Sequence, residues 1–309
     1  MNYFPNTTLA ESSVKLFNTR INKWLELMPI NDIQYIIMFP SHAIHNLYIY
    51  LKQKDIDNPL DKKKAFSSTN IHSYISSIIA LMKHSSQILP LIPQLHTYYT
   101  LWFDICEDNS KQIVKKRYDN VPTDMQIIKG AYNITYQDIL NKRNDTSLAL
   151  IDKLLLYMYT DIYPVRADYN SLSIIKENEQ PITPNYIILK NNSSELILTK
   201  FKTSNRYKQI HYPIMPQTVY DLIIESLIAE PRNYLFHKNG QPFTSNAFCK
   251  WANSRLQSIF NIDITLTFIR HLFLNTIDTN NMPTSELKRI GDLMGHSILT
   301  QKLYKWNSK

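Results

Sequence analysis

Two arginines stand among apolar residues in the second half of the chain. Arg166 follows a strongly apolar segment and a proline in "YPVRADY", so we expect it at a turn held by apolar neighbours. Arg270 lies within "LTFIRHLF". Because a guanidinium is rarely buried without an anionic partner, this helix should direct Arg270 at a carboxylate or into a cleft. Taken alone, Arg166 is better explained as a surface arginine, so its role depends on the other residues.

The segment "GDLMGHSILTQKLYKW" places a histidine between two predicted helices. Gly295 suits the end of the first helix, and Ser297 can cap a last helix that carries Tyr304. His296 would then occupy the corner between them. A lone histidine is usually a polar corner residue and a lone tyrosine an interface anchor, so chemistry requires that both meet other groups.

The composition is that of a folded soluble protein. Of the 309 residues, 44% are hydrophobic and 19% charged, and no apolar run is long enough to span a bilayer, which predicts a protein with no membrane partner. The N-terminus lacks the basic start and apolar stretch of a secretory signal. We therefore expect an intracellular protein, located wherever its target lies and not secreted, in which Cys106 and Cys249 are reduced.

The balance of charge favours a polyanionic partner. A net charge of +8 with a pI near 9.2 suits nucleic acid, although a solvated lysine-rich surface explains it equally well. Among the four glycines only Gly291 and Gly295 are close together, which argues against a nucleotide-cofactor loop. His42 and His45 form the best metal-like pair but have no third ligand nearby. We expect neither a cofactor nor a metal.

The apolar pattern divides the chain into two domains. Residues 1–120 show helical spacing throughout, and the last of these helices, from about Pro93, runs into a basic connector that we expect to contact DNA. The basic residues of this connector are Lys111, Lys115, Lys116 and Arg117. Pro122 disfavours helix at the residue before it, which places the start of a second domain, residues 121–309, at this point.

The second domain mixes helices with a few strands. The apolar run at 148–160 predicts a buried helix, and "NYIILKN", "SELILTKF" and "KQIHYPI" predict a three-stranded antiparallel meander. Helical patterns return after Pro216. The predicted fold class is α+β and mainly α: an N-terminal helical domain and a larger, mainly helical domain with a small antiparallel sheet.

The order of these features resembles the catalytic domain of the tyrosine recombinases, the integrase family that cuts and rejoins DNA through a covalent tyrosine. "RHLF" is similar to the family's second arginine box and "LMGHS" to its third. Tyr304 stands where the family has its nucleophile. The resemblance covers approximately residues 123–309. "FKTSNRYKQI" and "YPVRADY" look most like the branch found in large DNA viruses, virophages and related mobile elements.

The resemblance implies a role for each candidate residue. Arg166 and Arg270 would clamp the scissile phosphate, and His296 would donate a further hydrogen bond to it. Tyr304 would form a 3′-phosphotyrosyl bond and leave a free 5′-hydroxyl on the other side of the cut. A lysine in the turn of the second hairpin would protonate that departing oxygen.

Lys202 is the closest match to this hairpin lysine, and Lys200 and Lys208 are rivals. Arg206, in the same segment, is expected to contact DNA.

Three further residues are assigned supporting roles. Thr267 stands where the family usually has a histidine or lysine, and a hydroxyl can donate a hydrogen bond but cannot act as a base near pH 7. Asp168 is offset from the family's usual acidic position and either orients Arg166 or is simply exposed. His271 adjoins Arg270 in the second arginine box.

The predicted function is that of a site-specific DNA recombinase or integrase. Its partner would be a double-stranded recombination site, bound by a homotetramer of two dimers, with the N-terminal domain acting as a core-binding domain. A type IB topoisomerase is the nearest alternative, since it shares the catalytic set but works alone. A DNA-binding protein with a decayed site is another, and Thr267 is its best argument.

Overall fold

The structure of the chain, a computed structural model, describes residues 2–298 except 6, 62–63, 86–91, 93 and 119–133. It also describes Gln301. For residues 116–118 only the backbone is described. The chain forms two compact units, Met1–Val121 and Pro122–Lys309, and each is treated separately below. The fold class is α+β and mainly helical, as predicted.

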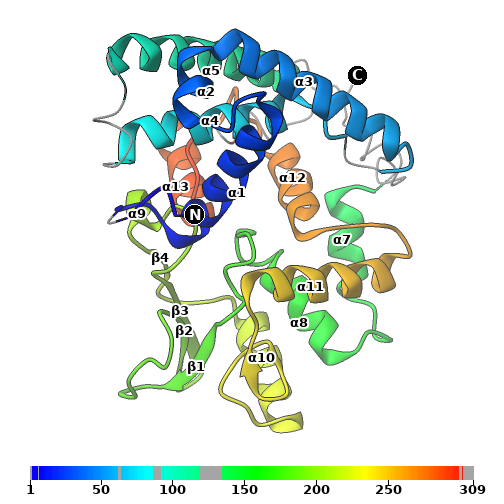
Figure 1. The fold of residues 1–309 in the computed structure, drawn as a ribbon. Coiled ribbons are helices and arrows are strands. Elements are labelled where there is room, and N and C mark those ends of the chain that lie inside the picture. Colours follow the sequence, from blue (N-terminus) through cyan, green and yellow to red (C-terminus); the bar gives the residue numbers. More distant parts are fainter. Residues whose placement is uncertain are drawn as a thin grey trace. The chain divides into compact units, whose positions relative to one another are not determined.

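The first unit is helical throughout its described part. Its helices are α1 (Glu11–Leu27), α2 (Ile33–Met38), α3 (Pro40–Asp57), α4 (Ser68–His84) and α5 (Leu95–Tyr118). Helix α4 packs along α5 (Figure 1). Trp24 and Trp102 meet edge to face at the centre, with ring centroids 5.8 Å apart. Their indole N–H groups donate to the carbonyls of Tyr74 and Ile37, so both large side chains are buried with their polar atoms satisfied.

The second unit combines helices with a four-stranded sheet. Its helices are α7 (Tyr136–Lys142), α8 (Leu150–Met158), α9 (Ser204–Tyr207), α10 (Gln217–Ala229), α11 (Ser245–Phe260), α12 (Leu266–Thr276) and α13 (Thr284–Met294). The main sheet has the order β1 (Ser173–Lys176), β2 (Asn185–Lys190), β3 (Ser193–Leu198) and β4 (Ile210–Tyr212). A separate pair comprises β5 (His237–Lys238) and β6 (Gln241–Pro242).

The predicted meander is confirmed, and the sheet has one strand more than expected. Strands β2, β3 and β4 pair antiparallel, with Ile187 opposite Leu196 and Ile197 opposite His211. Strand β1 pairs parallel to β2, which makes the sheet mixed. The sequence did not reveal β1 because a run of four residues carries too little periodicity to distinguish a strand from a loop.

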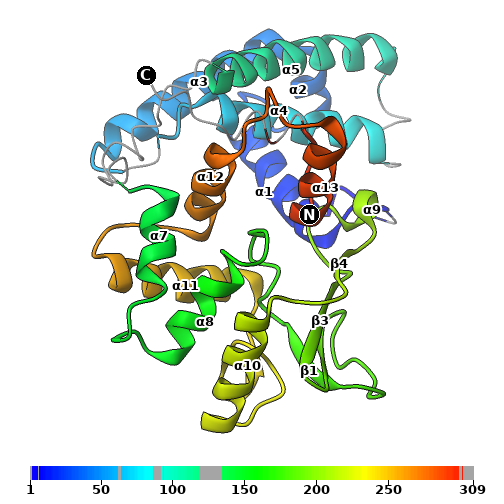
Figure 2. The same cartoon turned by 180° about the vertical axis from the view of Figure 1, so that it is seen from behind.

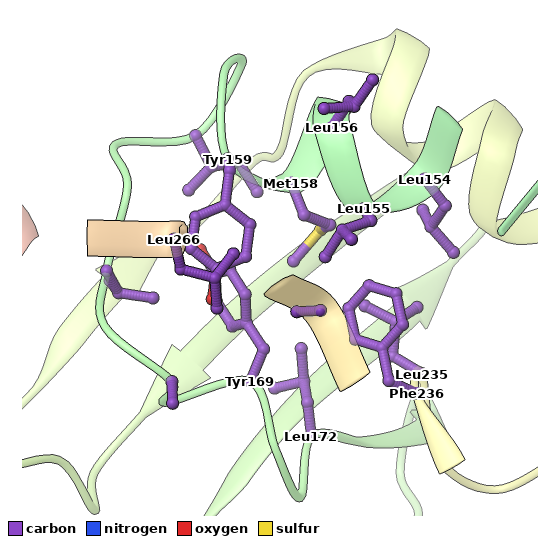
Figure 3. Packing of buried hydrophobic residues seen from close by; sticks show 14 of the residues in the cluster. Leu154, Leu155, Leu156, Met158, Tyr159, Tyr169, Leu172, Leu235, Phe236 and Leu266 are labelled. Carbon is purple, nitrogen blue, oxygen red and sulfur yellow. The ribbon is translucent and has the colours of Figure 1, made fainter. Parts of the chain in front are cut away.

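The core of the second unit surrounds α8. Leu154, Leu155, Leu156 and Met158 are all fully buried, and α8 lies beside α10 and α11 in both views (Figure 2). Figure 3 shows these side chains against aromatic and leucine residues that follow α8 in the chain. Helix α8 carries Asp152 and Lys153 near its start and buries its consecutive leucines and Met158, so it packs into the core as an amphipathic helix. The segment that leaves α8 and carries Arg166 therefore starts from a rigid position.

Candidate active site

Helix α12 brings an arginine into the interior of the second unit. The Thr265 hydroxyl caps the helix by accepting from the Phe268 N–H at 3.2 Å. The apolar face of the helix is buried, and it comprises Leu266, Phe268, Ile269, Leu272 and Leu274. The Arg270 side chain lies among them and is only 1% exposed. A permanently charged group at such depth needs polar partners on every side.

Arg270 connects two segments that are distant in the sequence. Its Nη1 donates to the carbonyl of Pro164, and its Nη2 lies 3.1 Å from Nδ1 of His296 and 3.5 Å from the carbonyl of Met294. The first contact reaches the segment that carries Arg166, and the other two reach the corner that carries His296. One guanidinium therefore holds these two segments together.

The turn at Arg166 is fixed through its backbone. The Asp168 carboxylate accepts from the Arg166 N–H at 3.1 Å, and the buried Tyr159 hydroxyl donates to the Arg166 carbonyl at 2.6 Å. Burial raises the pKa of Asp168, while the charges of Arg270 and Arg166 oppose this shift. Asp168 is therefore the nearby acidic group of an otherwise cationic cluster, and it orients the backbone of Arg166.

The corner after α13 is closed by two glycines. Gly295 adopts φ +65° and ψ 41°, the left-handed conformation that favours glycine, and ends the helix. A Cβ added at Gly291 would lie 2.6 Å from the His296 carbonyl oxygen and 2.8 Å from Nε2 of Gln301. Gln301 in turn donates to the carbonyl of Leu287 at 2.7 Å. The chain can pass this closely over α13 only because Gly291 has no side chain.

His296 is held as a neutral imidazole at this corner. It is 3% exposed, and burial lowers its pKa to about 3, helped by the charges of Arg270 and Arg166. Since a guanidinium can only donate, the contact with Arg270 makes Nδ1 the acceptor and leaves the ring proton on Nε2. A neutral histidine with this tautomer can donate one hydrogen bond to an anion.

The loop between β3 and β4 contacts the same corner. The Thr203 hydroxyl donates to the Gly295 carbonyl at 2.7 Å, and the Phe201 ring lies so close that a Cβ on Gly295 would approach it to 3.3 Å. Lys202 stands between these two residues, and its side chain is exposed. Lys200 and Lys208 are also exposed. Unlike Lys202, neither of them is flanked on both sides by residues that contact Gly295.

The supporting residues of the second unit lie at different depths. Thr267 is exposed in the first turn of α12, and His271, next to Arg270, is half-buried. Arg206 is exposed and lies over the ring of Tyr207 at 5.5 Å. Tyr304, the predicted nucleophile, lies outside the described residues.

The predicted basic connector lies on α5 of the first unit. Lys111 and Lys115 are both exposed. Lys111 forms ion pairs with Glu107 at 3.8 Å and Asp108 at 3.4 Å, which offset its charge. Lys116 and Arg117 belong to the same helix, but their side chains are outside the described part.

Within the described ranges, no three His, Cys, Asp or Glu side chains gather closely enough to bind a metal ion. His42 instead hydrogen-bonds the Tyr35 hydroxyl at 3.0 Å. None of the described helices combines the length and apolarity needed to cross a membrane. Cys106 and Cys249 are both free thiols.

Several residues that shape this cluster were not identified from the sequence. They are Tyr159, Asn185, Thr203 and Gln301, and each makes a hydrogen bond to backbone that lies 7 to 92 residues away. Such residues carry no local signal, because their role depends on contacts across the fold. The corner itself was predicted, from Gly295 as a helix end and Ser297 as the cap of the next helix.

The sequence matches no protein-family model and no curated protein. Among solved structures, the chain is similar to the crystal structure of XerA recombinase, with 12% sequence identity over 96% of this chain and 87% of that chain. The TM-score of that superposition is 0.41. A likeness at this level assigns neither family nor function, so the arrangement of the residues themselves has to support any proposal.

Proposed function

We propose that the second unit is the catalytic domain of a tyrosine-type DNA strand transferase, a site-specific recombinase or integrase. The observation that supports this most directly is the buried Arg270, which joins His296 to the Arg166 turn. Burying a guanidinium costs free energy. That cost is readily explained if the cluster binds a phosphate diester.

The cluster offers the donors that a phosphodiester requires. The two arginines keep their charge at any working pH, and the neutral His296 adds one N–H. Because the Arg270 and His296 side chains and the Arg166 backbone are fixed by the fold, little reorganisation is needed when negative charge develops on the phosphate. This arrangement requires no metal.

The proposed reaction exchanges one phosphoester for another. The phenolic oxygen of Tyr304 attacks phosphorus and releases its proton to solvent, a P–O bond to tyrosine forms, and the P–O bond to the 5′ oxygen breaks. Lys202 gives a proton to the departing 5′ oxygen. The product is a 3′-phosphotyrosyl bond with a free 5′-hydroxyl, and attack by a 5′-hydroxyl reverses the step. No nucleotide hydrolysis is needed.

Assembly and partners follow from the same proposal. The substrate is a double-stranded recombination site, bound by a tetramer of two dimers, and residues 1–120 serve as the core-binding domain. The basic charge of the chain suits this partner. The motifs that resemble recombinases of large DNA viruses, virophages and mobile elements suggest that source, and the protein then acts wherever such DNA lies.

A covalent-trapping experiment tests the proposal. We expect the protein to form a denaturant-resistant adduct with nicked duplexes from a library with a randomised central segment, labelled at the 5′ end of the cleaved strand. Tyr304→Phe should abolish the adduct, and Tyr220→Phe in α10 is the matched control that should retain it. Absence of any adduct in the unaltered protein, or its persistence in Tyr304→Phe, would refute the proposal.

Two other functions predict different outcomes. A type IB topoisomerase relaxes supercoiled plasmid as an isolated monomer, whereas a recombinase requires assembly on paired sites. A protein with a decayed site binds duplex DNA and forms no adduct. The "GHS" motif before the tyrosine favours the recombinase, and the cluster that links Arg270 to His296 argues against decay.

A further inference from the structure

Asn185 is a buried amide at the start of β2 whose hydrogen bonds join two segments of the candidate site. It is 2% exposed. Its Nδ2 donates to the carbonyls of Asp168 and Lys200, both at 2.9 Å. Its Oδ1 accepts from the N–H groups of Thr199, at 3.0 Å, and Lys200, at 2.9 Å. The amide uses its full capacity of two donated and two accepted hydrogen bonds.

These bonds act where the strand pairing stops. Asn185 pairs with Leu198 at the end of the β2–β3 ladder, so the backbone of residues 199 and 200 has no β2 partner of its own. The Asn185 side chain takes the place of that partner and continues the pairing into the loop. The same side chain also holds the carbonyl of Asp168, whose carboxylate accepts from the Arg166 backbone. One amide therefore sets the separation between the Arg166 turn and the start of the lysine loop.

Lys202 lies between two anchors of this loop. The first is Asn185, which fixes the backbone two residues before it. The second is Thr203, which bonds to the Gly295 carbonyl directly after it. The backbone of Lys202 is thus held on both sides although its side chain is exposed. Lys208 lies beyond the second anchor, at the end of α9, where its backbone has a positive φ of 59°.

We infer that Asn185 is a positioning residue for proton transfer in the cleavage step. It holds the loop so that the Lys202 ammonium reaches the 5′ oxygen as the P–O bond breaks. The proton moves from Lys202 to that oxygen, and Asn185 itself exchanges none. This inference rests on the proposed strand-transfer function and adds to it a residue that the sequence did not single out.

The test compares two leaving groups in the nicked duplex. One substrate has the normal 5′ oxygen at the scissile bond, and the other has sulfur there. A thiol has a pKa of about 8.5, so the sulfur leaves as an anion and needs no proton donor. With the oxygen substrate we expect Asn185→Ala to form the adduct about 10- to 100-fold more slowly than the unaltered protein, because a misplaced proton donor loses most of its effect.

With the sulfur substrate the same variant should reach within about threefold of the unaltered rate, since proton transfer contributes little to that reaction. Lys202→Ala should show the same selectivity with a larger loss on oxygen. Thr199→Ala is the matched control: it removes a hydrogen bond from the lysine loop to the Pro184 carbonyl, next to Asn185, but leaves the Asn185 bonds in place. It should change neither rate by more than about twofold.

Each remaining outcome is decisive. Equal losses of Asn185→Ala on both substrates, or no loss on either, would overturn the inference. Asn185→Asp keeps the size and the two accepting contacts but not the two donors, and it replaces Asn185→Ala if that variant fails to fold. If neither variant folds, the residue is structural and the inference is wrong. If the unaltered protein forms no adduct with either substrate, the proposed strand-transfer function is wrong, and the inference on Asn185 is wrong with it.

Discussion

At the scale of single residues, the candidate site depends on the contact between Arg270 and His296. Arg270 fixes the ring proton of His296 on Nε2, and its charge, together with burial, lowers the pKa of the imidazole. His296 in turn gives Arg270 a partner that accepts a hydrogen bond without adding negative charge. The pair therefore keeps a positive charge and no negative one at this buried corner.

The lowered pKa of His296 predicts a dependence of stability on pH. The pKa of this imidazole is 6.5 in the unfolded chain and about 3 in the folded chain. Between these pH values the unfolded state therefore binds more protons. The free energy of unfolding should thus fall as the pH is lowered from 6.5 towards 3 and be unaffected by this group above 6.5. Urea unfolding at several pH values should show a shallower fall for His296→Gln, and parallel curves would contradict the assignment.

Replacing Arg270 by lysine tests the geometry rather than the charge. A lysine cannot reproduce the planar fork that reaches both the Pro164 carbonyl and His296. We expect Arg270→Lys to slow adduct formation at least about 100-fold, the loss typical of a removed transition-state donor. Arg255→Lys, in an arginine paired with Asp152 elsewhere in the unit, is the control that should keep its activity. Similar rates for the two variants would count against Arg270.

At the scale of elements, close packing at the end of α13 fixes the position of His296. Its last turn passes beneath the His296 carbonyl, and the approach is possible only at Gly291. The helix then stops at Gly295, whose left-handed backbone turns the chain back over the helix. The position of His296 is thus a property of two glycines four residues apart.

Gly291→Ala distinguishes helix propensity from packing. In an open helix this change stabilises by about 1 kcal/mol. Here the new Cβ meets a backbone oxygen at 2.6 Å, which cannot rotate away, so we expect a loss of about 1–3 kcal/mol in the free energy of unfolding. Lys288→Ala on the exposed side of α13 should change it by less than about 0.5 kcal/mol. A stabilised Gly291→Ala would show that the corner is looser than described.

Sequence patterns predicted the elements whose signal is local. Apolar spacing predicted the helices, and alternating β-branched runs predicted β2, β3 and β4, because these signals lie within one element. Strand β1 escaped because its pairing with β2 is set by the fold. The same division holds in the site: the apolar neighbours of Arg270 predicted that it needs a polar partner, but its partner carbonyl at Pro164 lies 106 residues away. The sequence offered a carboxylate or a cleft instead.

At the scale of the whole molecule, the proposed function makes the net charge and its ion pairs decide how strongly the chain attracts DNA. The chain carries +8, yet a lysine that already has acidic neighbours contributes less than its formal charge suggests. Helix α5 contains one lysine with acidic neighbours and one without an ion pair among the described residues. Lys111 pairs with Glu107 and Asp108, whereas Lys115 has no ion pair within the part of the chain that the structure describes.

This difference predicts unequal effects on the binding of non-specific duplex DNA. Each lysine that neutralises a phosphate contributes about 0.9 to the slope of log affinity against log salt concentration. Lys115→Ala should therefore reduce the slope by nearly that amount. Lys111→Ala should reduce it by clearly less, because the charge of Lys111 is already offset by Glu107 and Asp108. Removing Lys111 leaves these two carboxylates to repel the DNA backbone, but it releases few additional counterions. Fluorescence anisotropy over a salt series measures both slopes, with Lys238→Ala, an exposed lysine of the second unit, as the control. Equal slopes for Lys115→Ala and the control would remove α5 from the DNA-binding surface and leave the candidate active site as the main source of phosphate contacts.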